Sequence, residues 1–240
     1  MRPLKLFLKK LASGNARLSR GFTVIELLVS LAIIGMIIGI VVYNHKQFDN
    51  GIELTNVAYR VALVFRQAQT YSISARQDVS GRFDVPYGVY LNTNANDSII
   101  FFADRNGNGN CDKLPGGAGC SSDERIEKIY FGNGNKSKRF CVIETNSNKT
   151  RCIPAVPGPQ PAAYGSVYSM DITFERPKPD AVIGLYNNSG NGNSPGGLPE
   201  RKAGFVCLTS PQGTLKKVVV YNTGQISVEN VPVGDPCASG

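Results

Sequence analysis

The stretch GFTVIELLVSLAIIGMIIGIVVY, residues 21–43, decides the fold because it has the composition of a membrane-spanning helix with one acid inside it. Between Phe22 and Val42 the only ionised side chain is Glu26. At about 1.5 Å per residue, a helix over these residues is roughly 30 Å long, which is enough to cross the hydrocarbon core of a bilayer. Acids inside membrane helices are costly and usually mark a function. We therefore expect Glu26 to have one.

The residues before this stretch predict its orientation. Residues 1–20 contain no acid and carry six bases, which are Arg2, Lys5, Lys9, Lys10, Arg17 and Arg20. By the positive-inside rule, the N terminus lies in the cytoplasm and the rest of the chain lies outside. A cleaved secretory signal is the alternative, but such a signal has a shorter apolar region and a small-residue cleavage site. The sequence IIGIVVYNHKQ, residues 37–47, supplies no such site.

The helical pattern continues beyond the apolar stretch. Apolar residues recur at spacings of three and four, with Arg60, Arg66, Gln67 and Gln69 between them; they are Leu54, Val57, Ala58, Val61, Val64, Phe65, Ala68, Tyr71 and Ala75. This spacing is typical of an amphipathic helix that packs against a folded domain. We predict one helix over 22–77, with a transmembrane part at about 22–43 and an amphipathic part at about 44–77.

Residues 78–240 predict a β-rich head. Nine short runs separated by Gly, Asn and Pro have the composition of strands: residues 87–92, 98–104, 125–131, 139–144, 169–175, 181–186, 203–210, 214–222 and 224–229. Their length and spacing favour antiparallel sheet. Two segments rich in Pro, Gly and Asn, 153–166 and 187–202, predict irregular loops. With no long linker, the head is one domain, and the fold class is α+β.

Six cysteines lie in the head: Cys111, Cys120, Cys141, Cys152, Cys207 and Cys237. None forms a C-x-x-C pair, so structural disulfides are favoured over a metal or redox site. Six cysteines allow about 15 connectivities. Pairing of sequence neighbours, 111 with 120, 141 with 152 and 207 with 237, closes three short loops. Disulfides require an oxidising compartment, which agrees with a head outside the cytoplasm.

The net charge of +8 does not by itself indicate a nucleic-acid-binding protein. Six of the 26 bases lie in residues 1–20, which leaves 20 bases against 18 acids in the rest of the chain. A DNA-binding domain needs a concentrated basic face. The composition of the body of this chain therefore gives no support to one.

The N-terminal residues resemble a known family. A short basic leader followed by GFTVIELLVSLAIIG, residues 21–35, is similar to the class III signal of type IV pilins and type II secretion pseudopilins. The resemblance implies a pilin-like fold, in which the long N-terminal helix packs on the β-rich head. It also implies cleavage by prepilin peptidase between Gly21 and Phe22, removal of residues 1–21 as a cytoplasmic leader, and N-methylation of Phe22.

The resemblance also gives Glu26 a role. In this family the glutamate at the fifth position of the processed chain pairs with the N-terminal amine of a neighbouring subunit as a subunit leaves the membrane for the filament. In a low-dielectric medium, each of two opposite charges removes the cost of leaving the other unpaired. A carboxylate that only reaches to the membrane interface is the alternative. Implied partners are prepilin peptidase, other pilins or pseudopilins and the bacterial inner membrane.

One loop of the head has the spacing of a calcium site. In ADRNGNGNCD, residues 103–112, the candidate ligands are Asp104, Asn106, Asn108 and Asp112. Asp104, Asn106, Asn108 and Gly109 fit the first half of an EF-hand loop, and Asp112 stands at the ninth position. Pro115 stands at the twelfth position, where a bidentate Glu is needed. Asp123 or Glu124 is a possible substitute for that Glu. The alternative is an Asn/Gly turn that binds no metal.

Two segments of the head resemble the FimT/GspH-like minor pilins and pseudopilins: the loop at 101–112 with its continuation DERI, and VCLTSPQGTLKKVVVYNTGQISVE, residues 206–229. Some members of that subgroup bind DNA through a Gly-Arg-x-Arg ending. This chain has Gly224, Gln225, Ile226 and Ser227 there, so both arginines are missing. Other bases are possible phosphate contacts, namely Lys136, Lys138, Arg139, Lys216 and Lys217, although lysines also keep strand edges soluble.

No catalytic motif is evident in the sequence. The one histidine, His45, follows the apolar stretch, and the chain has neither a P-loop nor a dinucleotide-binding fingerprint. We therefore expect a structural subunit, a minor pilin or pseudopilin with no small-molecule substrate, rather than an enzyme. A DNA-binding or adhesive pilus subunit, acting in DNA uptake or surface attachment, is the alternative.

Overall fold

The long N-terminal helix, α1, extends over Val24–Ile73. The computed structural model describes residues 21–74, 77–79, 81–112, 119–154, 167–187 and 200–238. The chain divides into two compact units, Met1–Lys46 and Gln47–Gly240, and the division falls within α1. The two units are therefore described separately. The helix lies inside the predicted limits of 22–77: Thr23 precedes its first turn, and Ser74 is a turn residue directly after its end.

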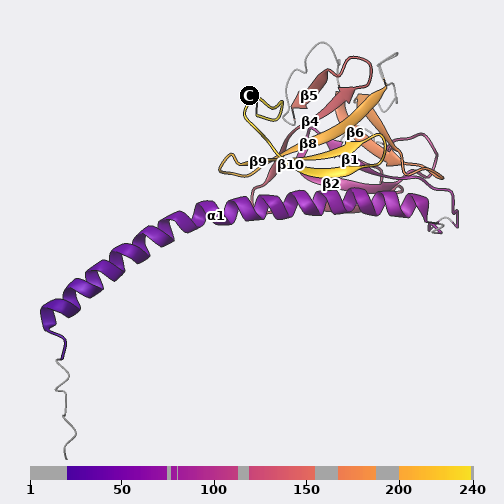
Figure 1. Cartoon of the computed structure of the whole chain (residues 1–240). Helices are drawn as coiled ribbons and strands as arrows, with labels where there is room; N and C mark the ends of the chain where they lie inside the picture. The colour runs from indigo at the N-terminus through magenta and orange to yellow at the C-terminus, as the bar shows by residue number, and fades with distance from the viewer. Residues whose placement is uncertain are drawn as a thin grey trace, which may run out of the picture. The chain divides into compact units, whose positions relative to one another are not determined.

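The second unit contains the β-rich head (Figure 1). Its described strands are β1 Tyr87–Asn92, β2 Ala95–Ala103, β3 Arg125–Tyr130, β4 Lys136–Glu144, β5 Thr150–Pro154, β6 Val167–Phe174, β7 Ala181–Asn187, β8 Arg201–Thr209, β9 Leu215–Tyr221 and β10 Ile226–Asn230. They form two five-stranded sheets with the orders β3-β2-β1-β6-β7 and β10-β9-β8-β4-β5. The strand pairs are antiparallel, so the predicted α+β fold with an antiparallel head is confirmed.

One strand, β5, was not predicted from the sequence. It is a short edge strand that pairs with β4, and Cys152 lies directly opposite Cys141 in this hairpin. The run TRCIP has no apolar alternation and ends in proline, which is tolerated at a sheet edge because an edge strand has a side that needs no hydrogen bonds. A strand that is ordered mainly by its partner and a cross-link gives no signal in its own sequence.

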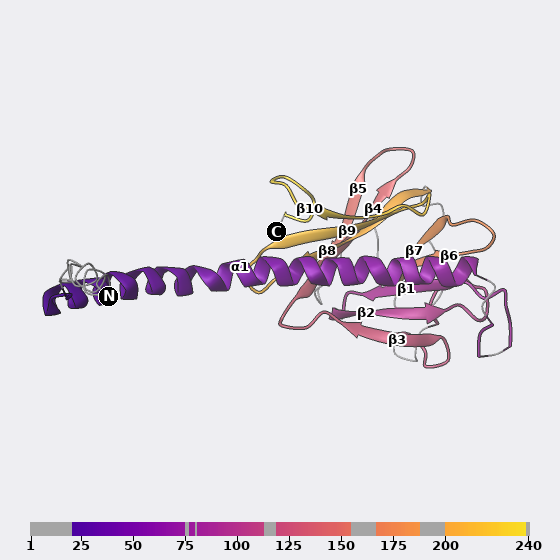
Figure 2. The same cartoon turned by 60° about the horizontal axis from the view of Figure 1, so that its bottom comes forward.

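The core of the head lies between the inner faces of the two sheets and the second half of α1. The apolar stripe of the helix is buried, and its members are Leu54, Val57, Ala58, Val61, Ala62, Val64, Phe65 and Ala68. This stripe packs with inward-facing residues such as Phe101 on β2, Ile172 on β6 and Val220 on β9. In Figure 2 this part of the helix runs across the head, with β8 to β10 drawn above it and β1 to β3 below it.

Each sheet also has a smaller apolar cluster on its outer face. The outer cluster of the first sheet is Tyr90, Ile100, Phe102, Cys111 and Cys120. The outer cluster of the second sheet includes Phe205 and Val219 with Cys141, Cys207 and Cys237. The disulfides are Cys111–Cys120, Cys141–Cys152 and Cys207–Cys237, which is the sequence-neighbour pairing. Cys111–Cys120 and Cys207–Cys237 thus lie in clusters on the outer faces of the sheets, whereas Cys141–Cys152 joins the paired strands β4 and β5.

The two loops predicted to be irregular lie largely outside the described residues, at 155–166 and 188–199. Their flanks are better ordered than we expected. Ile153 and Pro154 belong to β5, and Arg201 and Lys202 begin β8. These flanks are extended because they pair with β4, a contact that the composition of the loops does not reveal.

Candidate functional site

The start of α1 carries the residues that the sequence singled out for processing and assembly. Thr23 caps the helix: its Oγ1 accepts a hydrogen bond from the backbone N–H of Glu26 at 3.3 Å, and its carbonyl accepts one from Leu27 at 3.1 Å. Thr and Glu at this spacing are a capping box at the sequence level. Gly21 and Phe22 precede the helix and are exposed, so the predicted cleavage point lies in a non-helical segment next to a capped helix.

The first part of α1 exposes apolar side chains on every side. Over Val24–Tyr43 the mean hydropathy is 2.8, and none of the segment is buried within the structure. Its large apolar side chains are between 51% and 83% exposed. A helix that is apolar all round needs an apolar environment. Among the described residues this is the one helix with the length and composition to cross a membrane, which supports membrane anchoring.

The second part of α1 is attached to the head by polar side chains as well as by its apolar stripe. An Nη atom of Arg60 donates to the carbonyl oxygens of Tyr130 and Phe131, at 2.7 and 2.9 Å, where β3 ends. Gln69 donates to the carbonyl oxygens of Pro179 and Gly224, at 3.0 and 2.9 Å. The helix thus supplies hydrogen-bond donors to backbone carbonyl groups of the head.

Sequence reasoning placed Arg60, Arg66 and Gln69 only on the polar side of an amphipathic helix. The structure gives each of them a backbone carbonyl partner on the head, and for Arg66 the partner is Ile226 on β10. No signal in the local sequence distinguishes a solvated arginine from one that caps a strand end. The partners are between 70 and 160 residues away in the sequence, so only the fold reveals them.

The candidate calcium ligands lie in one loop, and their side-chain oxygens accept hydrogen bonds within it. Both carboxylate oxygens of the buried Asp104 accept backbone N–H groups, with Gly107 at 2.7 Å on Oδ1 and Gly109 at 2.7 Å on Oδ2. The side-chain amides of Asn106 and Asn108 donate to the Asp112 carboxylate, each at 2.7 Å. The Oδ1 atoms of these two Asn residues accept backbone N–H groups.

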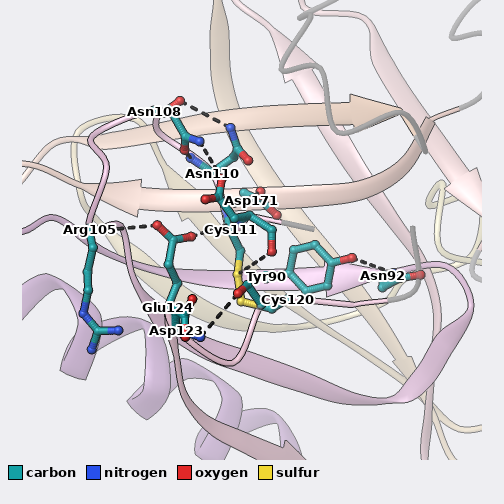
Figure 3. Close-up of a disulfide and its surroundings, with 12 residues drawn as sticks. Tyr90, Asn92, Arg105, Asn108, Asn110, Cys111, Cys120, Asp123, Glu124 and Asp171 are labelled. Atoms are coloured by element: carbon teal, nitrogen blue, oxygen red, sulfur yellow. Dashed lines mark hydrogen bonds between the residues drawn. A yellow bond between two sulfur atoms is a disulfide. The ribbon is translucent and has the colours of Figure 1, made fainter. Parts of the chain in front are cut away.

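Glu124 closes this loop as a hydrogen-bond acceptor (Figure 3). One carboxylate oxygen accepts the N–H of Arg105 at 3.1 Å and the other accepts the N–H of Asp112 at 2.7 Å. Burial, together with the nearby Asp112 carboxylate, raises the pKa of Glu124. Asp123 is exposed, and its backbone N–H is bonded to Ser121. Within the described part of the chain, no group of three or more His, Cys, Asp and Glu side chains is arranged to hold a metal. The calcium site at Asp104, Asn106, Asn108 and Asp112 therefore stays a prediction.

The basic residues considered for phosphate contacts are bonded within the head, except Lys136, which is exposed. Lys138 donates to the carbonyl oxygen of Cys237 at 3.2 Å, and Arg139 donates to that of Pro236 at 3.0 Å. Lys217 forms salt bridges with Asp235 at 2.8 Å and Glu229 at 3.3 Å. Lys216 donates to the side chain of Asn230 at 2.6 Å. Three of these bases thus hold the C-terminal segment on the second sheet, together with the Cys207–Cys237 disulfide.

The motif GQIS, residues 224–227, has a structural role in this chain. Gly224 has a φ of +82°, and a side chain there would overlap the carbonyl oxygen of Pro179 and the amide of Gln69. Only glycine satisfies both the positive φ and the close approach. Ile226 is buried in the main core. In some members of the subgroup that this chain resembles, the corresponding segment binds DNA. In this chain the segment contacts α1 through the hydrogen bond from Gln69 to Gly224.

The comparisons with known proteins bear on the N-terminal segment. A family model described as the prokaryotic N-terminal methylation motif matches residues 16–42. No curated protein and no solved structure matches the chain. The matched residues include Gly21, Phe22, Thr23 and Glu26 and most of the apolar segment of α1. The N-terminal segment therefore carries the prokaryotic N-terminal methylation motif, and this motif, with the apolar helix and the antiparallel β-rich head, supports the resemblance to type IV pilins and pseudopilins.

Proposed function

We propose that this protein is a minor pilin or pseudopilin of the FimT/GspH-like kind, a structural subunit of a type IV pilus or a type II secretion pseudopilus and not an enzyme. The observation that carries the proposal is the methylation motif at residues 16–42, which contains most of a helix segment with no buried surface. A helix that exposes apolar side chains all round is suited first to lipid and then to neighbouring helices in a filament.

In this proposal residues 1–21 are the cytoplasmic leader, residues 22–77 the N-terminal helix and residues 78–240 the head. Prepilin peptidase cuts between Gly21 and Phe22, and Phe22 is then methylated. The basic leader supports a cytoplasmic N terminus at the bacterial inner membrane. The three disulfides support a head that folds outside the cytoplasm.

Glu26 acts in assembly in this proposal. Its carboxylate pairs with the methylated amine of Phe22 on a neighbouring subunit when the apolar segment enters the filament. Each charge alone would be costly in an apolar environment, whereas the pair is much less so. The side chain of Glu26 lies in the first turn of α1, one turn from Phe22, so both partners lie at the same end of the helix.

The alternative of a DNA-binding subunit is not favoured by a specific observation. Lys138, Arg139 and Lys217 are occupied by the C-terminal segment. A gel-shift assay of the full chain with duplex DNA at low salt tests the alternative. A salt-sensitive shift that disappears in a Lys136→Gln, Lys216→Gln variant would favour it over a purely structural role.

The test of the main proposal is the N terminus of the protein purified from membranes of cells that express a prepilin peptidase. We expect N-terminal sequencing and intact mass to show a chain that begins at methylated Phe22. Gly21→Leu should abolish cleavage. Gly35→Ala is the matched control, because it changes a glycine with open space around it and should be processed normally.

Processing and assembly are then separated by Glu26→Gln. This variant removes the charge and keeps the shape, so we expect normal cleavage and loss of the subunit from sheared filaments. A chain that retains Met1, or normal cleavage of the Gly21→Leu variant, would overturn the proposed processing. Normal incorporation of Glu26→Gln would overturn only the assembly role of Glu26.

A further inference from the structure

The outer face of the first sheet contains a cavity of about 170 Å³ that the proposed function does not use. It lies over three adjacent strands, β1, β2 and β3. Its lining residues are Tyr90, Asn92, Asn94, Ala95, Ser98, Ile100, Gly119, Cys120, Arg125 and Lys128.

The fold holds the walls of this cavity in place. Tyr90 on β1 lies opposite Ile100 on β2, and Ile100 lies opposite Lys128 on β3, so all three are register neighbours on one face of the sheet. The Cys111–Cys120 disulfide packs beside Tyr90 and closes another side (Figure 3). A site on paired strands beside a cross-link is more precisely positioned than a site on loops alone.

The charged residues that line the cavity are both cations, and two carboxylates lie just outside the lining: Asp97 accepts the Ser98 hydroxyl at 2.8 Å, and Asp171 lies opposite Tyr90 in the sheet. None of its lining residues is acidic, and two of them, Arg125 and Lys128, are cations. In the described part of the chain neither cation is within salt-bridge distance of a carboxylate, and the Lys128 ammonium lies 4.7 Å from the centre of the Tyr130 ring. Two cations with no acidic partner at a small cavity favour an anionic ligand. Arginine can bind a carboxylate through two parallel hydrogen bonds.

The remaining walls combine fixed polar groups with apolar patches. The buried Asn92 donates to the hydroxyl of Tyr90 at 2.6 Å and accepts the N–H of Asn94 at 2.7 Å, so its position is fixed. Asn94 is exposed at the rim, whereas Ser98 is buried in the wall. Ala95, Ile100 and the disulfide supply apolar surface. A sugar ring presents hydroxyl groups at its edge and C–H groups on its faces, which matches such a wall.

Size and access exclude a nucleic-acid base as the preferred ligand. Tyr90 is only 1% exposed, so its ring is not available as a stacking platform. The cavity is also smaller than the roughly 300–1,000 Å³ of sites that enclose drug-sized ligands. It fits one small ring rather than an extended ligand.

We propose that this cavity binds a single acidic sugar unit, a hexuronate or a closely similar ring with one carboxylate. The carboxylate faces Arg125 and Lys128, and the ring lies over Ile100 between Asn94 and Ser98. This gives the head a ligand of its own. The site depends neither on leader cleavage nor on filament assembly, so its test is independent of the proposed subunit role.

Isothermal titration of the full chain in detergent tests the site with three probes: D-glucuronate, D-glucose and inorganic phosphate. We expect saturable binding of glucuronate that is at least about tenfold tighter than that of glucose, because glucose lacks the carboxylate. Phosphate, which has the charge but no ring, should bind at least about tenfold more weakly than glucuronate.

Arg125→Gln should weaken glucuronate binding by about tenfold or more, and Asn94→Ala should weaken glucuronate and glucose alike. Lys136→Gln is the matched control, because this exposed lysine on β4 is outside the cavity, and it should bind as the wild type does. Arg125 and Asn94 are both exposed, so neither change threatens folding. The proposal is overturned by an absence of saturable glucuronate binding, by equal binding of glucuronate and phosphate, or by unchanged binding in Arg125→Gln.

Discussion

Residues 24–43 and residues 54–68 of α1 are both rich in apolar side chains, yet their surroundings differ completely. In the first segment the large apolar side chains are at least 51% exposed. In the second, the apolar stripe from Leu54 to Ala68 is at most 7% exposed, because both sheets of the head pack on it. The first segment therefore depends on an apolar environment that the chain does not supply. The second segment is covered by the head of the same chain. The difference teaches that one helix can serve anchoring and folding in separate stretches.

The largest expected effect tests the burial of the apolar stripe from Leu54 to Ala68. Phe65→Ala should lower the free energy of unfolding of the head by about 3–5 kcal/mol, because it leaves a cavity among well-packed residues. Leu63→Ala is the matched control; this side chain is 63% exposed, and the change should stay within about 0.5 kcal/mol. Urea unfolding of the full chain in detergent measures both. Equal effects would mean that α1 does not pack on the sheets.

The next largest expected effect concerns membrane insertion of residues 24–43. Ile33 and Leu63 are similarly exposed, at 55% and 63%, but we assign them to lipid and to water respectively. Ile33→Asp should oppose membrane insertion by about 3 kcal/mol, whereas Leu63→Asp should leave it unchanged. Alkaline extraction of membranes measures the fraction of each chain that is integrated. If the two variants behave alike, the contrast between the halves of the helix is wrong.

A smaller effect concerns the contact between the second part of α1 and the head at Gly224. Gly224→Ala and Gly213→Ala both place a side chain at a φ near +83°, but only the side chain at 224 would also collide with Pro179 and Gln69. Gly213→Ala should cost about 1 kcal/mol, and Gly224→Ala about 3 kcal/mol or more, since the collision adds to the backbone strain. Urea midpoints of the two variants give the difference. Equal midpoints would contradict the close approach of Gly224 to Pro179 and Gln69.

The smallest expected effect concerns the stability that Glu124 contributes in a loop of the head away from α1. The folded-state pKa of Glu124 is raised by burial, so the folded state holds this proton more tightly than the unfolded state does. The contribution of Glu124 to stability is therefore fully present below its unfolded pKa and is lost as the pH rises through the folded pKa. Melting temperatures of wild type and Glu124→Gln between pH 4 and 7 should show a smaller decline with rising pH in the variant. Parallel curves for the two proteins would contradict this assignment.

Much of the fold was predictable because its signals are local. The apolar run and the heptad-like stripe from Leu54 to Ala68 are periodic in the sequence, and the strand runs are bounded by turn residues. The short strand β5 was missed because its order comes from pairing with β4 and from the cysteine opposite it. The spacing of Asp104, Asn106, Asn108 and Asp112 predicted a calcium site or an Asn/Gly turn, and spacing does not show that the oxygens of Asp104 accept backbone N–H groups.

By itself the sequence determined the N-terminal motif, the apolar segment and the division into a helix and a β-rich head, since each follows from residues near one another in the chain. The tertiary structure decided what depends on residues far apart: the carbonyl groups capped by Arg60 and Gln69, the C-terminal segment held by Lys217, and the cavity beside Tyr90. The physical reason is that periodicity reports whether a side chain faces a core or solvent. It does not report which distant backbone group or side chain that face will meet.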